Sequence, residues 1–139
     1  MSRICGIELK SSEAILAVID SADDGNTFIN IEPKKIKLGD DESVEMVKSF
    51  YDSVINFSKD NHIDVFVIKK RAKKGQMAGG AVSFKLEALI QLNGLADVKF
   101  VSGQGIAAAQ KKEAFEIPDG LNKYQENAFM AASLYIRKN

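Results

Sequence analysis

The chain has 139 residues, of which 45% are hydrophobic and 27% are charged, and its formal net charge is zero. This length and composition predict one domain, residues 1–139, with a single sizeable core. A neutral chain has no overall field that draws it onto nucleic acid or a membrane, so electrostatic recognition has to come from a local cluster. No apolar stretch reaches the roughly 18 residues of a membrane span. The start of the chain lacks a signal-peptide pattern, and the one cysteine, Cys5, has no internal disulfide partner. We therefore expect a cytoplasmic protein with no membrane partner.

The first part of the chain predicts an antiparallel sheet. The four polar residues 10–13 lie between two apolar runs, 4–8 and 14–19, and this pattern predicts a hairpin. A turn at 23–26 leads into an alternating strand at 27–31, and Pro33 favours an edge position for that strand.

Helices and strands alternate in the rest of the chain. The acidic residues 40–42 precede a helix that has apolar residues at three-to-four spacing between positions 47 and 57. The later elements are expected to be a strand at 65–68, a helix at 83–93, a strand at 97–101, a helix at 102–112 and a final helix at 122–136. Alternating strands and helices imply parallel pairing through right-handed crossovers. We expect an α/β fold with a mixed sheet of about five strands, in which three antiparallel strands precede parallel β-α units and helices cover both faces. This is the arrangement of the ribonuclease H-like fold.

One buried strand ends in a cluster of cations. The apolar run that begins at Ile63 is followed by five cations and then by the glycine-rich segment 75–80. Such a cluster can neutralise phosphates and release their counterions, which gives binding that ignores sequence. We take the cluster as a candidate nucleic-acid-binding site for DNA or RNA, with a solvated charge run as the alternative. Its residues are Lys69, Lys70, Arg71, Lys73, Lys74 and Gln76.

Several segments resemble Holliday-junction resolvases of the RuvC type. The segment 4–10 resembles the opening strand of that family, and 65–68 with 83–88 resembles its fourth strand and following helix. The segment 127–132 resembles its closing helix. The chain is more similar still to a group of uncharacterised bacterial proteins, known only as a domain of unknown function and thought to share this fold. The resemblance implies a ribonuclease H-like fold and brings no activity with it.

The departures from the resolvase pattern fall at its catalytic positions. Those nucleases hold two divalent cations with about four carboxylates, because hard cations need several anionic oxygens. The resemblance places Glu8 at the first of these positions, Lys69 at the second, and Tyr124 and Asn127 at the last two. Three of the four acids are therefore replaced, and we expect a degenerate nuclease centre with no metal. We also hypothesise that Lys69 lies beside Glu8 and neutralises it in place of a metal ion.

Two alternatives stay open beside non-catalytic binding of nucleic acid. The chain is an active nuclease if Glu8 is joined by Glu87 or Glu126 in a divergent carboxylate set, and Mg²⁺ or Mn²⁺ is then its cofactor. Otherwise it is a protein-interaction or dimerisation module, and a homodimer is a possible partner in every case.

Overall fold

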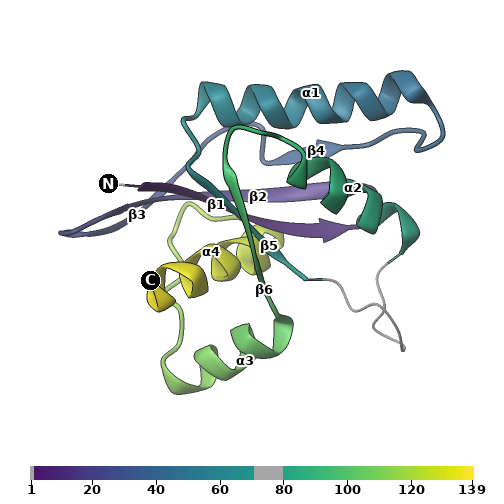
Figure 1. Ribbon diagram of the computed structural model, residues 1–139. Coiled ribbons are helices and arrows are strands. Elements are labelled where there is room, and N and C mark those ends of the chain that lie inside the picture. The colour runs from purple at the N-terminus through teal and green to yellow at the C-terminus, as the bar shows by residue number, and fades with distance from the viewer. Residues whose placement is uncertain (1, 71–79) are drawn as a thin grey trace.

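A mixed sheet of six strands runs through the middle of the molecule (Figure 1). The computed structural model describes residues 2–70 and 80–139. In chain order the elements are β1 (Ser2–Lys10), β2 (Glu13–Ala22), β3 (Gly25–Ile29), β4 (Lys35–Lys37), α1 (Val44–Asp60), β5 (Val65–Lys69), α2 (Ala81–Gln91), β6 (Asp97–Val101), α3 (Gly103–Lys112), the 3₁₀ helix η1 (Lys123–Gln125) and α4 (Glu126–Lys138).

The strand order confirms the predicted mixture of antiparallel and parallel pairing. The order is β3-β2-β1-β5-β6, and β4 also pairs with β2. The pairs among β1 to β4 are antiparallel, whereas β5 pairs in parallel with β1 and β6. The sixth strand arises because the edge beside β2 is interrupted around Pro33, which has no backbone N–H to donate. β3 pairs with residues 18–22 of β2 and β4 with residues 13–15, so a short strand that was not predicted follows the expected third strand along the same edge.

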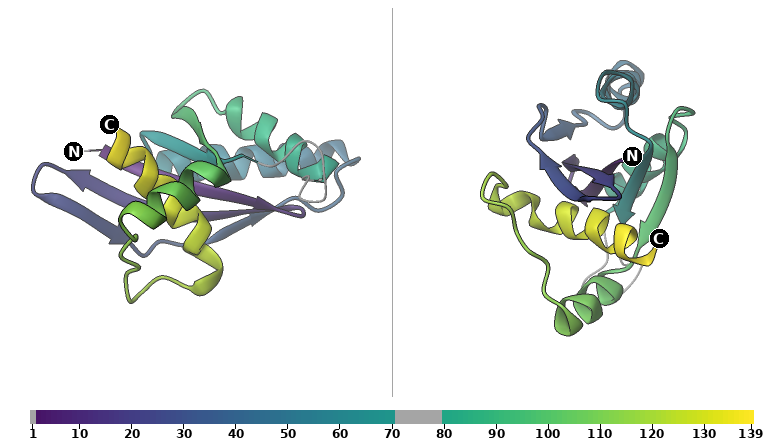
Figure 2. Two further views of the ribbon diagram at one scale, coloured as in Figure 1. Left: turned by 90° about the horizontal axis from the view of Figure 1, so that it is seen from below. Right: turned by 90° about the vertical axis from the view of Figure 1, so that its left-hand side faces the viewer.

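Helices cover both faces of the sheet, as predicted. Figure 2 shows α1 on one side of the strands, and α3 and α4 on the other. The core is divided accordingly. Phe50 of α1 and Leu86 of α2 belong to one cluster, which also contains Cys5, Ile7 and Leu9 of β1. The second cluster contains Ile106 of α3 and several buried residues of α4, packed on the opposite face of the strands. The central strands are therefore buried on both faces.

The helix starts follow local capping chemistry. The N-cap of α1 is Ser43, whose hydroxyl accepts a hydrogen bond from the backbone N–H of Met46. The helix begins after the predicted acids 40–42 because these form a turn, in which Glu42 N–H bonds to the side chain of Asp40. Ser102 caps α3 as predicted, and its hydroxyl accepts from Gly105 N–H at 2.9 Å.

Helix α4 lies in direct contact with β1, and Gly6 makes this approach possible. A Cβ atom placed on Gly6 would lie 1.8 Å from the carbonyl oxygen of Ala128, so no larger residue fits without moving the helix. The start of α4 is fixed by Gln125, which is 2% exposed and donates a hydrogen bond to the carbonyl of Leu16 at 2.8 Å. That carbonyl lies opposite the gap between β3 and β4. The position of α4 over the sheet is thus set by backbone contacts.

Candidate nucleic-acid interface

Glu8 and Lys69 lie side by side at one end of the sheet. They are partners in the parallel register of β1 and β5, and each is the last or nearly the last residue of its strand. Residues directly opposite one another in neighbouring strands point to the same face of a sheet. Both side chains therefore lie on the face that carries α4, and the predicted adjacency of these positions is confirmed.

Asn127 completes this group from the first turn of α4. Its side-chain amide donates a hydrogen bond to Oε2 of Glu8 at 2.9 Å. Both side chains are half-buried. The contact depends on the close approach of α4 to Gly6, two residues before Glu8 on the same face of β1. The structure thus brings together three of the residues that the resemblance singled out.

The expected ion pair between Lys69 and Glu8 is not formed, so that hypothesis is wrong as a direct contact. No salt bridge among the described residues joins the two side chains. The Lys69 side chain extends toward α3 instead, and its Cε atom lies 3.5 Å from where a Cβ of Gly103 would be. Glu8 is satisfied by an amide and not by an ammonium group.

Tyr124, which the resemblance assigned to a catalytic position, makes its contacts away from Glu8. It belongs to η1, and the residue is 42% exposed. The ammonium group of Lys35 lies over this ring, 4.3 Å from the centroid. The phenol oxygen accepts a hydrogen bond from the side chain of Asn122 at 3.3 Å. Tyr124 therefore orients a lysine of β4.

Glu87 lies on the wrong face of the sheet to join Glu8. Helix α2 packs through Leu86 and Ile90 into the core cluster that contains α1, whereas Glu8 points to the α4 side. Glu126 opens α4 directly before Asn127 and is half-buried. Within residues 2–70 and 80–139, no three His, Cys, Asp or Glu side chains gather closely enough to hold a metal ion. A set containing Glu8, Glu87 and Glu126 together is therefore ruled out, and a pair of Glu8 with Glu126 stays a prediction.

Lys70 directly follows the last residue of β5, and its side chain is exposed to solvent. Its backbone N–H donates to the carbonyl of Val101 at 2.8 Å, so the pairing of β5 with β6 extends one residue beyond Lys69. The Lys70 side chain is exposed and lines a hollow of about 560 Å³ together with Lys99 and Lys138. The remaining predicted binding residues lie outside the described residues. These are Arg71, Lys73, Lys74 and Gln76.

Sequence reasoning missed a second group of lysines on the same face. Lys35 and Lys37 of β4, together with Lys10 at the end of β1, line a hollow beside the β1–β2 turn. The signal was the alternation Lys-Ile-Lys at 35–37, in which Ile36 is buried and both lysines are exposed. Three residues are too few for a period-two pattern to be distinguished from chance.

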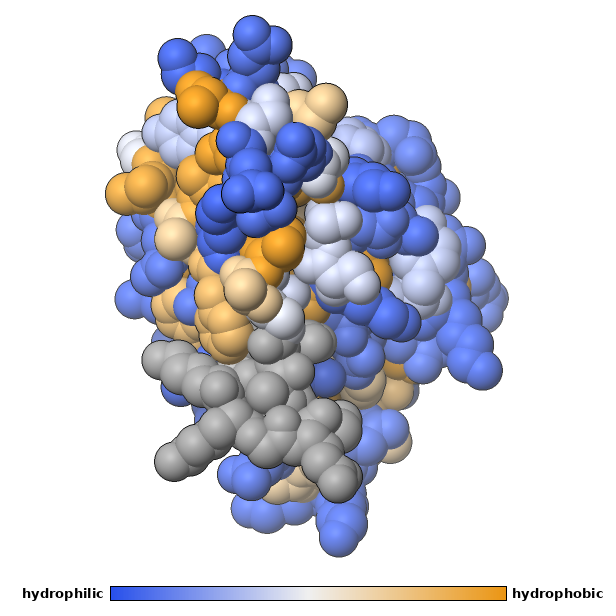
Figure 3. Space-filling model, turned by 90° about the vertical axis from the view of Figure 1, so that its right-hand side faces the viewer, coloured by the Kyte–Doolittle hydropathy of each residue, from blue (hydrophilic) through white to orange (hydrophobic). Residues whose placement is uncertain are grey.

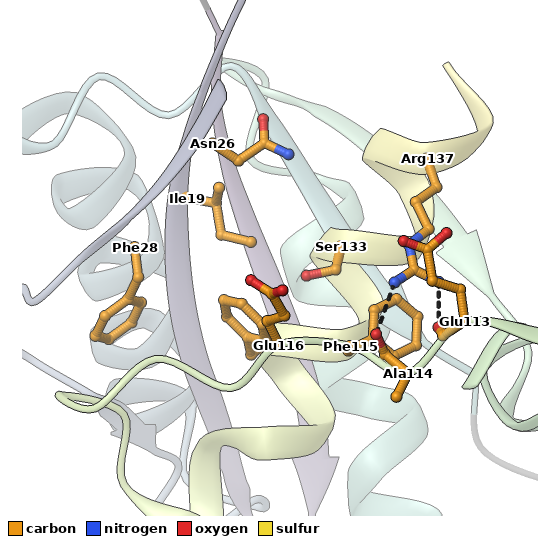
Figure 4. A pocket seen from close by; sticks show the side chains of 10 residues that line it. Ile19, Asn26, Phe28, Glu113, Ala114, Phe115, Glu116, Ser133 and Arg137 are labelled. Atoms are coloured by element: carbon orange, nitrogen blue, oxygen red, sulfur yellow. Dashed lines mark hydrogen bonds between the residues drawn. The ribbon is translucent and has the colours of Figure 1, made fainter. Parts of the chain in front are cut away.

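A separate hollow of about 490 Å³ is lined by residues of β2, β3, α4 and the segment 113–116. Figure 4 shows Asn26 of β3, Ser133 of α4 and Glu116 around its aromatic side chains. Arg137 closes one side, because its guanidinium lies 4.0 Å from the ring centroid of Phe115 and donates to the carbonyls of Glu113 and Ala114. None of the predicted site residues that the structure describes lines this hollow.

Several large apolar side chains are exposed on or near α1 and α2, on the side of the sheet opposite α4. Val44 is 70% exposed and Leu92 is 66% exposed, and Met46 and Leu95 are also among the exposed large hydrophobic residues. Figure 3 shows apolar side chains among hydrophilic ones on the face that carries the start of these helices. The homodimer stays a prediction. No helix in the described part of the chain is long and apolar enough to cross a membrane.

The sheet order and the two helix layers are those of Holliday-junction resolvases of the ribonuclease H-like class. The structure is similar to RuvC of Thermus thermophilus, with a TM-score of 0.73 and 11% identity over 98% of this chain and 96% of that one. A structure of T. thermophilus RuvC in complex with a Holliday-junction substrate gives a TM-score of 0.68 at 11% identity, over 100% and 97% of the two chains. The fowlpox virus Holliday-junction resolvase gives 0.57 at 15% identity, over 99% of each chain.

The family follows from a match to residues 2–135: the chain belongs to DUF3010, described as a protein of unknown function. No curated protein matches the chain. The resemblance read from the sequence is thereby confirmed for both the resolvase-like fold and the uncharacterised family.

Proposed function

We propose that this protein binds nucleic acid without cleaving it, at the end of the sheet that carries Glu8, Lys69 and Asn127. The observation that carries the proposal is the hydrogen bond from the Asn127 amide to Glu8. This bond engages the Glu8 carboxylate with an amide donor, from a position that the resemblance assigns to a further carboxylate of a metal-dependent nuclease. The similarity in fold to resolvases, one of which has been solved with a Holliday-junction substrate, supports nucleic acid as the partner.

The chemistry of this group argues against metal-dependent cleavage. A two-metal mechanism needs several carboxylate oxygens that converge on one point. Here one carboxylate is engaged by an amide N–H, and the neighbouring strand presents a lysine at the same register. The ammonium group of Lys69 makes no ion pair with Glu8, but a positive charge on the neighbouring strand still opposes the approach of a cation and favours an anion.

Basic side chains on the α4 face support binding to phosphates. Lys69 ends β5 and Lys70 follows it. Lys99 and Lys138 line the adjacent hollow, and further cations follow in the sequence at 71–74. Each lysine that neutralises a phosphate releases counterions, so affinity falls as salt concentration rises. A chain of zero net charge gains such a local field only by concentrating its cations on one surface.

The test is the salt dependence of binding to labelled four-way junction, duplex and single-stranded DNA, followed by fluorescence anisotropy. The double variant Lys69→Gln/Lys70→Gln is expected to lower the slope of log K against log salt concentration by about 2, since each lost phosphate contact removes about 0.9. The matched control is Lys48→Gln/Lys59→Gln, two exposed lysines of α1 on the other face. Lack of binding by the unmodified protein to all three DNAs and to single-stranded RNA would overturn the proposal.

The alternative of an active nuclease is supported by the fold and by the carboxylate that persists at the end of β1. It requires Glu8 to act with Glu126 at the start of α4. It predicts Mn²⁺-dependent cleavage of a four-way junction that is lost in Glu8→Gln. Under our proposal the unmodified protein does not cleave, and Glu8→Gln binds DNA about twofold to fivefold more tightly because a negative charge is removed from a basic surface.

A further inference from the structure

Three lysines that the sequence reasoning missed lie in two adjacent rows of the sheet. One row runs from Lys69 of β5 through Glu8 and Ile15 to Lys35 of β4. The next row runs from Lys10 of β1 through Glu13 to Lys37 of β4. Because side chains alternate between the faces of a strand, both rows point to the α4 side. The lysines of β1 and β4 therefore lie on the same face as Glu8, on the flank opposite Lys69.

These lysines surround a hollow of about 290 Å³, which we call the hairpin hollow. It is lined by Lys10, Lys35 and Lys37, by the two serines of the β1–β2 turn, and by Tyr124. The turn is held in place because the carbonyl of Ser11 accepts a hydrogen bond from the Ser83 hydroxyl at 3.1 Å, and the carbonyl of Ser12 accepts from Leu38 N–H at 2.8 Å. The hollow is thus built on fixed backbone.

The charge in the hairpin hollow is not balanced by the side chains around it. Glu13 is the one acid among the lining residues, and its carboxylate lies 3.8 Å from the ammonium group of Lys35. In the part of the chain that the structure describes, Lys10 and Lys37 take part in no salt bridge. Both are exposed and flank Glu13 in one row. Two net positive charges remain, so an anion that enters the hollow relieves the repulsion between them.

Tyr124 holds the third lysine at the wall of the hollow. The ring lies 4.3 Å from the Lys35 ammonium group, so a cation–π contact restricts this side chain to one region. The ring is itself positioned by η1, whose Gln125 is anchored to β2. An oriented ammonium loses less entropy on binding an anion than one on a freely rotating side chain.

We propose that the hairpin hollow binds a backbone phosphate of the nucleic acid, with Lys10 and Lys37 as direct contacts and Tyr124 as the residue that positions Lys35. This inference rests on the proposed function and extends it to a second contact. Neighbouring strands are about 4.8 Å apart, so three strand spacings separate Lys35 from Lys69 by about 14 Å. At about 3.4 Å per nucleotide step along one strand of a duplex, that distance spans roughly four steps. One nucleic acid can therefore reach both cation groups.

The decisive variant is Lys10→Gln/Lys37→Gln, measured on the same labelled DNAs between about 50 and 200 mM salt. We expect the slope of log K against log salt concentration to fall by about 2, and the affinity to fall about tenfold near 0.1 M salt. The control Lys48→Gln/Lys59→Gln is expected to match the unmodified protein. Tyr124→Phe keeps the ring and is expected to bind normally, whereas Tyr124→Leu weakens binding about twofold to threefold without altering the thermal midpoint of unfolding.

The outcomes separate this inference from the proposed function. Suppose that the unmodified protein binds DNA and that Lys69→Gln/Lys70→Gln weakens this binding while Lys10→Gln/Lys37→Gln does not. The inference that the hairpin hollow binds phosphate is then overturned, and the proposed function stands. If only Lys10→Gln/Lys37→Gln weakens DNA binding, the inference about the hairpin hollow is supported and the proposed contact at Lys69 is overturned. If no nucleic acid binds, both are overturned. Amide chemical-shift changes at Ser11 and Ser12 on adding inorganic pyrophosphate would then assign the hollow to a free phosphate.

Discussion

The side-chain amide of Asn127 and the carboxylate of Glu8 are joined by a hydrogen bond of 2.9 Å, which connects the first turn of α4 to β1. Replacing Asn127 by Ala removes the donor and leaves a half-buried carboxylate without it. We expect the free energy of unfolding to fall by about 1 kcal/mol, as measured by urea denaturation. The control is Asn56→Ala on the exposed face of α1, which corrects for the higher helix propensity of alanine. Equal effects of the two substitutions would contradict the contact.

Asn127→Asp tests how close the protein is to a metal site. Two carboxylates then face each other where an amide and a carboxylate stood, and their repulsion lowers the thermal midpoint at pH 7 below that of Asn127→Ala. Because paired carboxylates attract a divalent cation, millimolar Mn²⁺ is expected to raise the midpoint of this variant. The unmodified protein is expected to show no such rise. A variant whose midpoint ignores Mn²⁺ would show that residues 8 and 127 cannot share an ion.

Gly6→Ala tests the close approach of α4 to the sheet. The new methyl group would lie 1.8 Å from the carbonyl oxygen of Ala128, and a backbone atom cannot rotate away. We expect a loss of about 3 kcal/mol or more in the free energy of unfolding. Gly120→Ala is the matched control, because the nearest atom to its new methyl group is 3.7 Å away in the Phe28 ring. A Gly6→Ala protein as stable as this control would show that the helix stands further from β1.

Cys5 predicts a loss of stability at alkaline pH. Complete burial raises the pKa of the Cys5 thiol, because the thiolate would lose its hydration. The thiol therefore stays protonated in the folded protein, whereas in the unfolded chain it ionises near pH 8.5. The folded state binds more protons above that pH, so the free energy of unfolding falls as the pH rises.

Between about pH 8.5 and 9.5 this contribution amounts to about 1 kcal/mol. It is measured as the difference between the unmodified protein and Cys5→Ala in urea denaturation at the two pH values. A thiol reagent such as 5,5′-dithiobis(2-nitrobenzoic acid) is expected to react with Cys5 in urea and not in buffer. Rapid labelling of the folded protein would contradict the burial.

The succession of strands and helices could be predicted because each element carries a local signal. The turn at 23–26, the acids before α1 and the serine cap of α3 mark boundaries that local hydrogen bonds set. The short edge strand β4 could not be predicted, since it has only three residues and exists because it pairs with β2. Pairing of this kind depends on tertiary contact, which single-sequence patterns do not encode.

For the candidate site, the sequence predicted which residues of β1 and β5 lie side by side, but it did not predict which side chains are in contact. The placement of Glu8 beside Lys69 follows from parallel strands that are neighbours in the fold. The sequence does not indicate to which face of the sheet Glu8 points, because β1 is buried on both faces and its residues do not alternate between apolar and polar. For that reason Glu87, on a helix of the opposite layer, was among the candidates.

The anchor of α4 has a consequence for how this fold accommodates different chemistry. Gln125 is attached to a main-chain carbonyl of β2, and its own side-chain oxygen accepts from the backbone of Asn122 at 3.1 Å. Main-chain groups persist whatever side chains the strands carry. We therefore expect α4 to keep its position and orientation over the sheet when the residues at 8, 69 and 127 are exchanged. A scaffold whose last helix is held by the main chain can therefore carry different side chains at these three positions without a change of architecture.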